Sequence, residues 1–435
     1  MHPVLISSIL LALTSSSAIT SSWLGSRLEK FGLRVFDFER TTGRGLQTTR
    51  HRHEGEIVIS VPEEDAITLS SLLEMFPFLS EIVDKSIQDH REDSMPSQQF
   101  TDEQIMAMGL LLLKDKKDAY VMSLPTKQYS VLEMPDDLLF LLPSAYQKVI
   151  KAYQNYVFDL YNSLRDAFIG TSSTPKVVYL LSDKADFFWA FATIRSRCVG
   201  MDGTNDLRVR NGGDSNDEIR VLLPGFDLLN HRFGVEVIQE LEGGKYVIKS
   251  QEAYSAGDQV FISYSDKRDN LKMLMTYGFC PLVDNPEAIA FFDVQDLLDA
   301  CPRARPKYFP RKVLKQLQGL FVKLGQEKGL FRYDGRSKKA RPCLVHAINM
   351  MAEIENQLVS QIQTEPDHNF REDLLQVLLE TRIEEIDNAL GVIEGAKEKN
   401  AKEDEWISMF NSIRNLLTIE KTYLTANAHN AYCDT

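Results

Sequence analysis

Cysteine and long apolar runs are both scarce in this sequence. Its five cysteines are odd in number and scattered over 435 residues, and none forms a C-x-x-C pair. That pattern argues against a disulfide framework and against a structural zinc site of the paired-cysteine type. Apart from a short N-terminal segment, no apolar run approaches the roughly 20 residues that a membrane-spanning helix needs. We therefore expect a soluble mature chain whose thiols are free and mostly buried.

Basic residues are also outnumbered. The chain has 49 Lys and Arg against 62 Asp and Glu, a formal net charge of −13, which disfavours nonspecific binding of nucleic acid. A length of 435 residues with 43% hydrophobic and 26% charged residues is typical of a globular protein with two or three domains. Segment 303–341 is the exception, because it holds thirteen basic and only two acidic residues. It predicts either a solvated helical face or a docking surface for an acidic partner.

The N-terminal segment contains a ten-residue apolar run from Val4 to Leu13, followed by a Ser- and Thr-rich stretch. The run is too short to span a bilayer and is typical of the apolar part of a cleaved signal, although only His2 supplies a basic group before it. We interpret residues 1–22 as a targeting signal, with a frayed N-terminal helix as the alternative. Such a signal favours the secretory route, or a plastid reached through it; the cytoplasm and the nucleus are the alternatives.

The hydrophobic pattern predicts strands, then helices, then strands again. Residues 33–38 and 56–61 alternate apolar and polar side chains, and Gly43-Arg44-Gly45-Leu46 between them is typical of a turn. Over residues 72–181 the apolar spacing becomes helical. Strand patterns then return at 219–222, 245–249 and 259–264.

Helical spacing resumes from residue 311 to the end of the chain, where apolar residues recur three and four positions apart. The polar segments 85–100 and 200–217 are expected to be surface loops. The predicted order is therefore β–α–β–α, with helices interrupting an otherwise β-rich unit.

Several short motifs with chemical potential lie between Arg195 and Phe279. They are Arg195-Ser196-Arg197, Asp227-Leu228-Leu229-Asn230-His231, Phe261-Ile262-Ser263-Tyr264 and Tyr277-Gly278-Phe279. Each motif alone is weak evidence, since an isolated Asn-His pair is usually a turn and a Tyr at a strand end usually packs in a core. Their order and spacing are together much more specific.

With these motifs, the chain resembles the SET-domain methyltransferases over roughly Gly43 to Tyr423. The resemblance is to the branch that includes the plant Rubisco large-subunit lysine methyltransferase and the actin-histidine methyltransferase. It implies an α+β fold: a split SET β-fold of small antiparallel sheets, pseudoknot-like, with a helical insertion and a C-terminal all-α substrate-binding domain. The implied division starts with a targeting signal at residues 1–22. The SET domain follows in two parts, 23–71 and 186–285, with the helical insertion between them at 72–185. The helical domain takes up 286–435.

The resemblance also implies a cofactor, S-adenosyl-L-methionine, and the residues around it. Tyr264 looks like the catalytic tyrosine. The implied cofactor-binding residues are Arg44, Gly45, Leu46, Arg197, Asp227, Asn230, His231, Tyr277, Gly278 and Phe279. A guanidinium fork such as that of Arg197 suits the cofactor carboxylate, because it can bind both oxygens at once. An Asn side chain such as that of Asn230 offers both a donor and an acceptor.

The implied reaction is transfer of a methyl group to the side-chain amine of a lysine in a non-histone protein. A lysine with its ordinary pKa of about 10.4 is almost fully charged at neutral pH, so the site must lower that pKa by desolvation or by a nearby cation. Alignment of the reacting atoms then supplies most of the catalysis, and Tyr264 is expected to orient the amine rather than act as a general base.

Two other functions stay open. The same fold supports histidine methylation, and a catalytically silent SET-fold module could bind a protein partner without reaction. We expect a protein substrate as partner, no nucleic acid and no membrane span. No C-x-C cluster follows Phe279, and His51 and His53 lack a third ligand nearby, so we expect no metal site.

Overall fold

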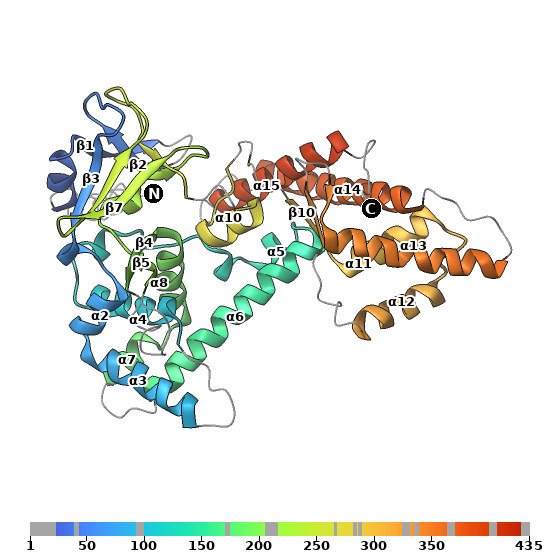
Figure 1. Ribbon diagram of the computed structural model, residues 1–435, viewed down its shortest axis with the longest axis horizontal. Helices are drawn as coiled ribbons and strands as arrows, with labels where there is room; N and C mark the ends of the chain where they lie inside the picture. Colours follow the sequence, from blue (N-terminus) through green and yellow to red (C-terminus); the bar gives the residue numbers. More distant parts are fainter. Residues whose placement is uncertain are drawn as a thin grey trace, which may run out of the picture. The chain divides into compact units, whose positions relative to one another are not determined.

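The computed structural model describes residues 23–38, 43–92, 100–169, 175–204, 216–264, 268–281, 285, 289–323, 331–334, 339–362, 370–399 and 407–427. The chain divides into two compact units (Figure 1). The N-terminal unit consists of Met1–Gln128 and Tyr156–Ser265, and the C-terminal unit of Tyr129–Asn155 and Asp266–Thr435. The candidate targeting signal, residues 1–22, lies outside the described residues.

The N-terminal unit carries small sheets rather than one large one. Strands β1 and β2 pair antiparallel, β8 lies between β3 and β7 in a second sheet, and β4 and β5 form a hairpin. Short strands β6 and β9 pair in parallel. The bounds are β1 Leu33–Phe38, β2 Gly43–Thr48, β3 Ile57–Pro62, β4 Val199–Thr204, β5 Asn216–Val221, β6 Asn230–His231, β7 Val237–Glu242, β8 Lys245–Ser250 and β9 Phe261–Ile262.

In the sequence, a series of helices lies between strands β3 and β4. Helices α2, α4 and α8 begin after a polar side chain that accepts from their first turn, as Thr101 does from the N–H of Gln104 ahead of α4. Helix α4 is buried on all sides from Gln104 to Leu113 and packs against α8. The bounds are α2 Leu69–Met75, α3 Pro77–Glu92, α4 Asp102–Asp115, η2 Val121–Ser123, α6 Ser144–Ile169, α7 Pro175–Leu180, α8 Lys184–Arg197 and, after β5, η4 Phe226–Leu228.

The C-terminal unit is mainly helical. Helix α14 packs against α11, α13 and α15, and the apolar positions of all four meet in one core that includes Leu378 and Leu417 (Figure 1). A fully buried guanidinium, that of Arg382, bonds Glu420 and Asp296 within this core. The bounds are α5 Asp136–Leu139, α10 Asn270–Tyr277, α11 Val294–Ala304, α12 Arg311–Lys323, α13 Pro342–Ile362, α14 Phe370–Lys399 and α15 Ile407–Asn427.

The structure corrects four expectations from the sequence. The C-terminal unit is not all-α, since it holds a three-stranded sheet in the order β10, β11, β12, formed by Ile289–Phe292, Phe331–Asp334 and Lys339–Ala340. These strands are too short to show a period in the sequence. The segment expected as a loop from residue 85 begins inside helix α3, whose amphipathic character extends to Glu92. The expected loop 200–217 begins and ends in the β4–β5 hairpin.

The fourth correction concerns Gly43-Arg44-Gly45-Leu46, which is not a turn. These residues open strand β2, and Gly45 lies extended opposite Phe36 of β1. Only Gly43 has a positive φ, of 67°, which places the glycine-dependent bend at the very start of the strand. The five expected segments stay predictions, although residues 129–155, expected in the insertion, belong to the C-terminal unit.

Candidate functional site

Arg197 lies at the C-terminal end of α8, and the helix itself favours a cation there. The helix begins at Asp183, whose side chain accepts from the N–H of Ala185, and its last turn carries Arg195 and Arg197. Cations at this end interact favourably with the helix dipole. The Nη1 atom of Arg197 donates to both the carbonyl oxygen and Oδ2 of Asp227, each at 3.0 Å.

Asp227 is the fixed partner in this ion pair. Its side chain is 2% exposed, against 18% for Arg197. The second carboxylate oxygen, Oδ1, accepts from the N–H of Gly225 at 3.1 Å, and Gly225 makes the bend into η4 with a φ of 88°. Because both carboxylate oxygens are bonded, the buried charge is compensated and Arg197 is held in one place.

Asn230 joins the second half of the site to strand β2. Its Nδ2 donates to the carbonyl oxygen of Arg44 at 3.2 Å. A Cβ atom at Gly45 would lie only 2.5 Å from that Nδ2, so this approach requires a glycine. The adjacent Leu46 is buried, and its carbonyl oxygen accepts from the N–H of Val260 at 2.9 Å. Strand β2 is thereby tied to the segments before β9 and at β6.

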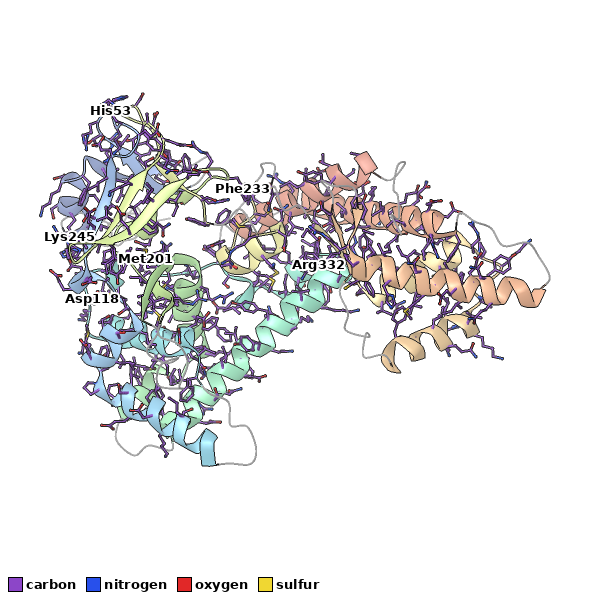
Figure 2. The ribbon with its side chains drawn as sticks, viewed as in Figure 1. His53, Asp118, Met201, Phe233, Lys245 and Arg332 are labelled. Carbon is purple, nitrogen blue, oxygen red and sulfur yellow. The ribbon has the colours of Figure 1, made fainter. Side chains whose placement is uncertain are left out.

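His231 and Tyr264 lie together where β6 and β9 pair. The backbone N–H of Tyr264 donates to Nδ1 of His231 at 3.1 Å, so Nδ1 acts as an acceptor. The two rings are 5.2 Å apart at 35°, and Phe233 (labelled in Figure 2) covers the imidazole edge-on. The Tyr264 hydroxyl donates to the carbonyl oxygen of Leu229 at 2.8 Å.

Eight predicted site residues are therefore in the N-terminal unit, on elements that contact one another. The other three belong to the C-terminal unit. Tyr277 ends helix α10, Gly278 has a φ of 76° as its left-handed cap, and Phe279 lies 6.1 Å from Tyr277 between ring centres. A side chain at Gly278 would overlap the carbonyl oxygen of Tyr129, so this glycine is required by local packing.

Sequence reasoning missed two residues of the helical insertion that border the site. Nη2 of Arg44 donates to the carbonyl oxygen of Ser123 at 3.3 Å, and Tyr120, three residues earlier, is buried close to Asp227. No local signal marks either residue. The proximity of Tyr120 to Asp227 and the bond of Ser123 to Arg44 both result from tertiary packing between segments far apart in the sequence.

The electrostatics of the site reflect its burial. Desolvation is the main reason that the pKa of Arg44 is lowered; Asp227 raises it and the guanidinium of Arg197 lowers it further. Burial also raises the pKa of the Cys198 thiol to about 12, so this neighbour of Arg197 is an uncharged thiol at neutral pH. Within the described residues, no group of three or more His, Cys, Asp or Glu side chains could hold a metal ion.

Comparison with known proteins gives sequence relatives of one kind. No family model matches the chain. It is 24% identical over 273 residues to SET domain-containing protein 4 of Homo sapiens, which is 60% of this chain and 57% of that protein. It is 32% identical over 114 residues to the chloroplastic Rubisco large subunit N-methyltransferase of Pisum sativum, 24% of this chain and 21% of that enzyme. The chain thus spans less than two thirds of the curated relatives it matches.

Comparison of folds also finds the Rubisco LSMT. A crystal structure of the SET domain of LSMT, bound to lysine and AdoHcy, superposes with a TM-score of 0.58 at 17% identity. The match covers 96% of this chain and 91% of that one. Within the described residues, no helix is both long and apolar enough to cross a membrane. In sequence, this chain is thus similar to SET domain-containing protein 4 and to the Rubisco large subunit N-methyltransferase, and its fold is similar to that of the LSMT SET domain.

Proposed function

We propose that this protein is an S-adenosylmethionine-dependent methyltransferase that modifies the side-chain amine of a lysine in a non-histone protein. The observation that carries the proposal is the grouping of Arg197, Asp227, Asn230, His231 and Tyr264 within one unit. Relatives named as lysine methyltransferases, and a similar fold with lysine and AdoHcy bound, support it.

The residues present fit such a cofactor. Nε of Arg197 is buried and has no hydrogen-bond partner among the described residues, although Nη1 is bonded to Asp227. A buried donor without an acceptor is costly, and a carboxylate group on a ligand would satisfy it. Arg197 would therefore hold the amino-acid end of the cofactor. Asn230, His231 and the backbone of Arg44–Leu46 would hold the rest.

When bound, the cofactor supplies an electrophilic methyl group. Tyr264 would orient the amine that receives it. A phenol that donates to a carbonyl, as Tyr264 does to Leu229, can still accept an N–H at its oxygen. Its half-buried position favours a neutral amine, because desolvation lowers the pKa of a lysine. Tyr264 is thereby an orienting group and need not take the proton itself.

Basic residues of α12 would dock the protein substrate or another acidic partner. Around this helix some cations are already compensated: Arg303 bonds Glu384, and Arg305 bonds Asp373. Arg311, Lys312 and Lys315 are instead exposed, and the described residues provide no ion-pair partner for them. Two of the three lie in the first turn, where the helix dipole disfavours cations, so an acidic partner would relieve this unfavourable interaction.

For the compartment, we propose that residues 1–22 direct the protein to a plastid. The support is the chloroplastic relative together with the signal-like composition of the segment. Fusion of residues 1–28 to a fluorescent protein tests this. Fluorescence that stays in the cytosol would contradict it.

The activity is tested with purified full-length protein, isotope-labelled S-adenosylmethionine and a lysate of the source organism. Labelled proteins are hydrolysed, and the methylated amino acid is identified. Label on lysine supports the proposal. Label on histidine would contradict it and identify histidine as the residue that accepts the methyl group. If no protein is labelled and the cofactor does not bind, the protein is a catalytically silent module that binds a protein partner.

A matched pair of variants tests the assignment of the site. Arg197→Lys replaces the fork by a single ammonium and should weaken cofactor binding by about tenfold or more. Arg195→Lys, two residues away and bonded to Glu103 instead, should leave binding unchanged. Equal affinities for the two variants would remove Arg197 from the site.

A further inference from the structure

Tyr120 lies in the helical insertion, and hydrogen bonds fix the backbone around it. It immediately precedes η2, and its N–H and that of Val121 both donate to Oδ1 of Asp118, each at 3.0 Å (Asp118 is labelled in Figure 2). Three residues after Tyr120, the carbonyl oxygen of Ser123 accepts from Arg44. The segment 118–123 is therefore anchored to strand β2 as well as to its own first turn.

The hydroxyl of Tyr120 lies near the carboxylate of Asp227 and interacts with it electrostatically. The residue is 4% exposed, and this hydroxyl has no hydrogen bond of ordinary geometry to a described residue. Burial and the carboxylate of Asp227 raise the pKa of this phenol well above its usual value, while Arg197 acts in the opposite direction. Tyr120 thus remains a protonated donor at every physiological pH, next to the Arg197–Asp227 pair.

Charge around this hydroxyl is unbalanced. Arg44 and Arg197 influence each other, and both share the single carboxylate of Asp227, so the three side chains carry one net positive charge. The nearby carboxylate of Glu103 is already bonded to Arg195 at 3.1 Å and Arg220 at 2.9 Å. Uncompensated positive charge that is partly removed from water is unfavourable and attracts an anion.

Two buried donors therefore lie beside an excess positive charge: the Tyr120 hydroxyl and Nε of Arg197. We propose that Tyr120 is a further residue of the cofactor site, where its hydroxyl donates to the carboxylate of the bound cofactor together with Arg197. This proposal rests on the proposed function and goes beyond it, since it assigns a specificity role to the helical insertion. It requires a ligand with a carboxylate, not merely a nucleoside.

The test compares two ligands by calorimetry with the full-length protein and its Tyr120→Phe variant. S-adenosylhomocysteine has the amino-acid carboxylate, and methylthioadenosine lacks it. We expect Tyr120→Phe to weaken S-adenosylhomocysteine binding about tenfold, because a hydrogen bond to a charged group is lost. Binding of methylthioadenosine should change less than about twofold, since the nucleoside makes no use of this donor.

Tyr161→Phe is the matched control. Tyr161 is also a buried tyrosine of the N-terminal unit, but its hydroxyl donates to the carbonyl oxygen of Leu181 at 2.8 Å. Its loss should lower the unfolding temperature without changing either affinity. If Tyr120→Phe leaves both affinities unchanged, or weakens both ligands equally, the assignment of Tyr120 is wrong while the proposed function stands. If the wild-type protein binds neither ligand, both proposals are overturned.

Discussion

The side-chain amide of Asn230 occupies the space that a side chain on Gly45 would need. Nδ2 of Asn230 lies 2.5 Å from an ideal Cβ position at Gly45, and Nε2 of Gln259 lies 2.6 Å from it. The same Asn230 nitrogen donates to the carbonyl oxygen of Arg44. Gly45 is far from Asn230 in the sequence. Because it has no side chain, it determines where the side-chain amide of Asn230, a predicted cofactor-binding group, can lie.

Gly45→Ala should displace the Asn230 amide from Arg44. We expect cofactor affinity to fall about tenfold, because one hydrogen bond is lost and the amide is misdirected. Calorimetry with S-adenosylhomocysteine measures this. Gly25→Ala is the control: a Cβ there meets no atom within 4 Å, the residue is in a helix, and we expect unchanged affinity with about 0.5 to 1 kcal/mol greater stability. Wild-type affinity in Gly45→Ala would contradict the role of this contact.

Tyr264→Phe should separate cofactor binding from reaction. It removes the hydroxyl but keeps the ring beside His231, so cofactor affinity should change little. Turnover should fall about a hundredfold if this hydroxyl orients the amine. Steady-state kinetics and calorimetry on the same preparation test both parts. Tyr254→Phe removes a hydroxyl that bonds Glu252 instead and should leave turnover unchanged. Unchanged turnover in Tyr264→Phe would remove this residue from the mechanism.

Gly278→Ala should destabilise the C-terminal unit. The residue has a positive φ, and a Cβ would overlap the backbone carbonyl of Tyr129, which cannot move aside as a side chain would. Strain and overlap together should cost about 3 kcal/mol in free energy of unfolding. Gly319→Ala, in α12 with open space around it, should be neutral or stabilising. Equal stability of the two variants, measured by denaturant unfolding, would disprove the packing argument.

Reversal of charge on α12 should weaken docking of an acidic partner. In the double variant Lys312→Glu/Lys315→Glu, we expect KM for the protein substrate to rise about tenfold at low salt, with kcat and cofactor affinity unchanged. The difference should shrink as ionic strength rises. Lys30→Glu/Lys245→Glu makes the same change in net charge on exposed residues of the N-terminal unit. If both double variants raise KM equally, net charge rather than this helix is responsible.

The cysteines should differ in reactivity. Burial raises the pKa values of Cys198 and Cys301 to about 12, so their reactive thiolate forms are negligible at pH 8. Cys343 is exposed. Brief alkylation of the native protein at pH 8, followed by mass spectrometry, should label Cys343 and leave Cys198 and Cys301 unmodified. Rapid labelling of Cys198 in the folded protein would mean that its surroundings open to solvent.

Local pattern predicted those elements whose residues repeat with a clear period. The alternation in residues 33–38 predicted a strand, and these residues form β1. The helical spacing of the leucines in α14 predicted a buried face, and leucines of α14 lie in the core. The pattern failed for Gly43–Leu46, since two glycines indicate a turn whether or not the chain bends. It also failed for β10 and β11, whose four residues each are shorter than any reliable period.

The sequence by itself determined the family resemblance, because motif order along the chain is a linear property and needs no contacts. It likewise identified Arg197, Asn230, His231 and Tyr264 as candidates. Only the tertiary structure decided their arrangement: that Asp227 holds Arg197, that His231 accepts from the Tyr264 backbone, and that Tyr120 lies close to Asp227. The physical reason is that burial and hydrogen bonding depend on distances between segments far apart in sequence, which no local periodicity records.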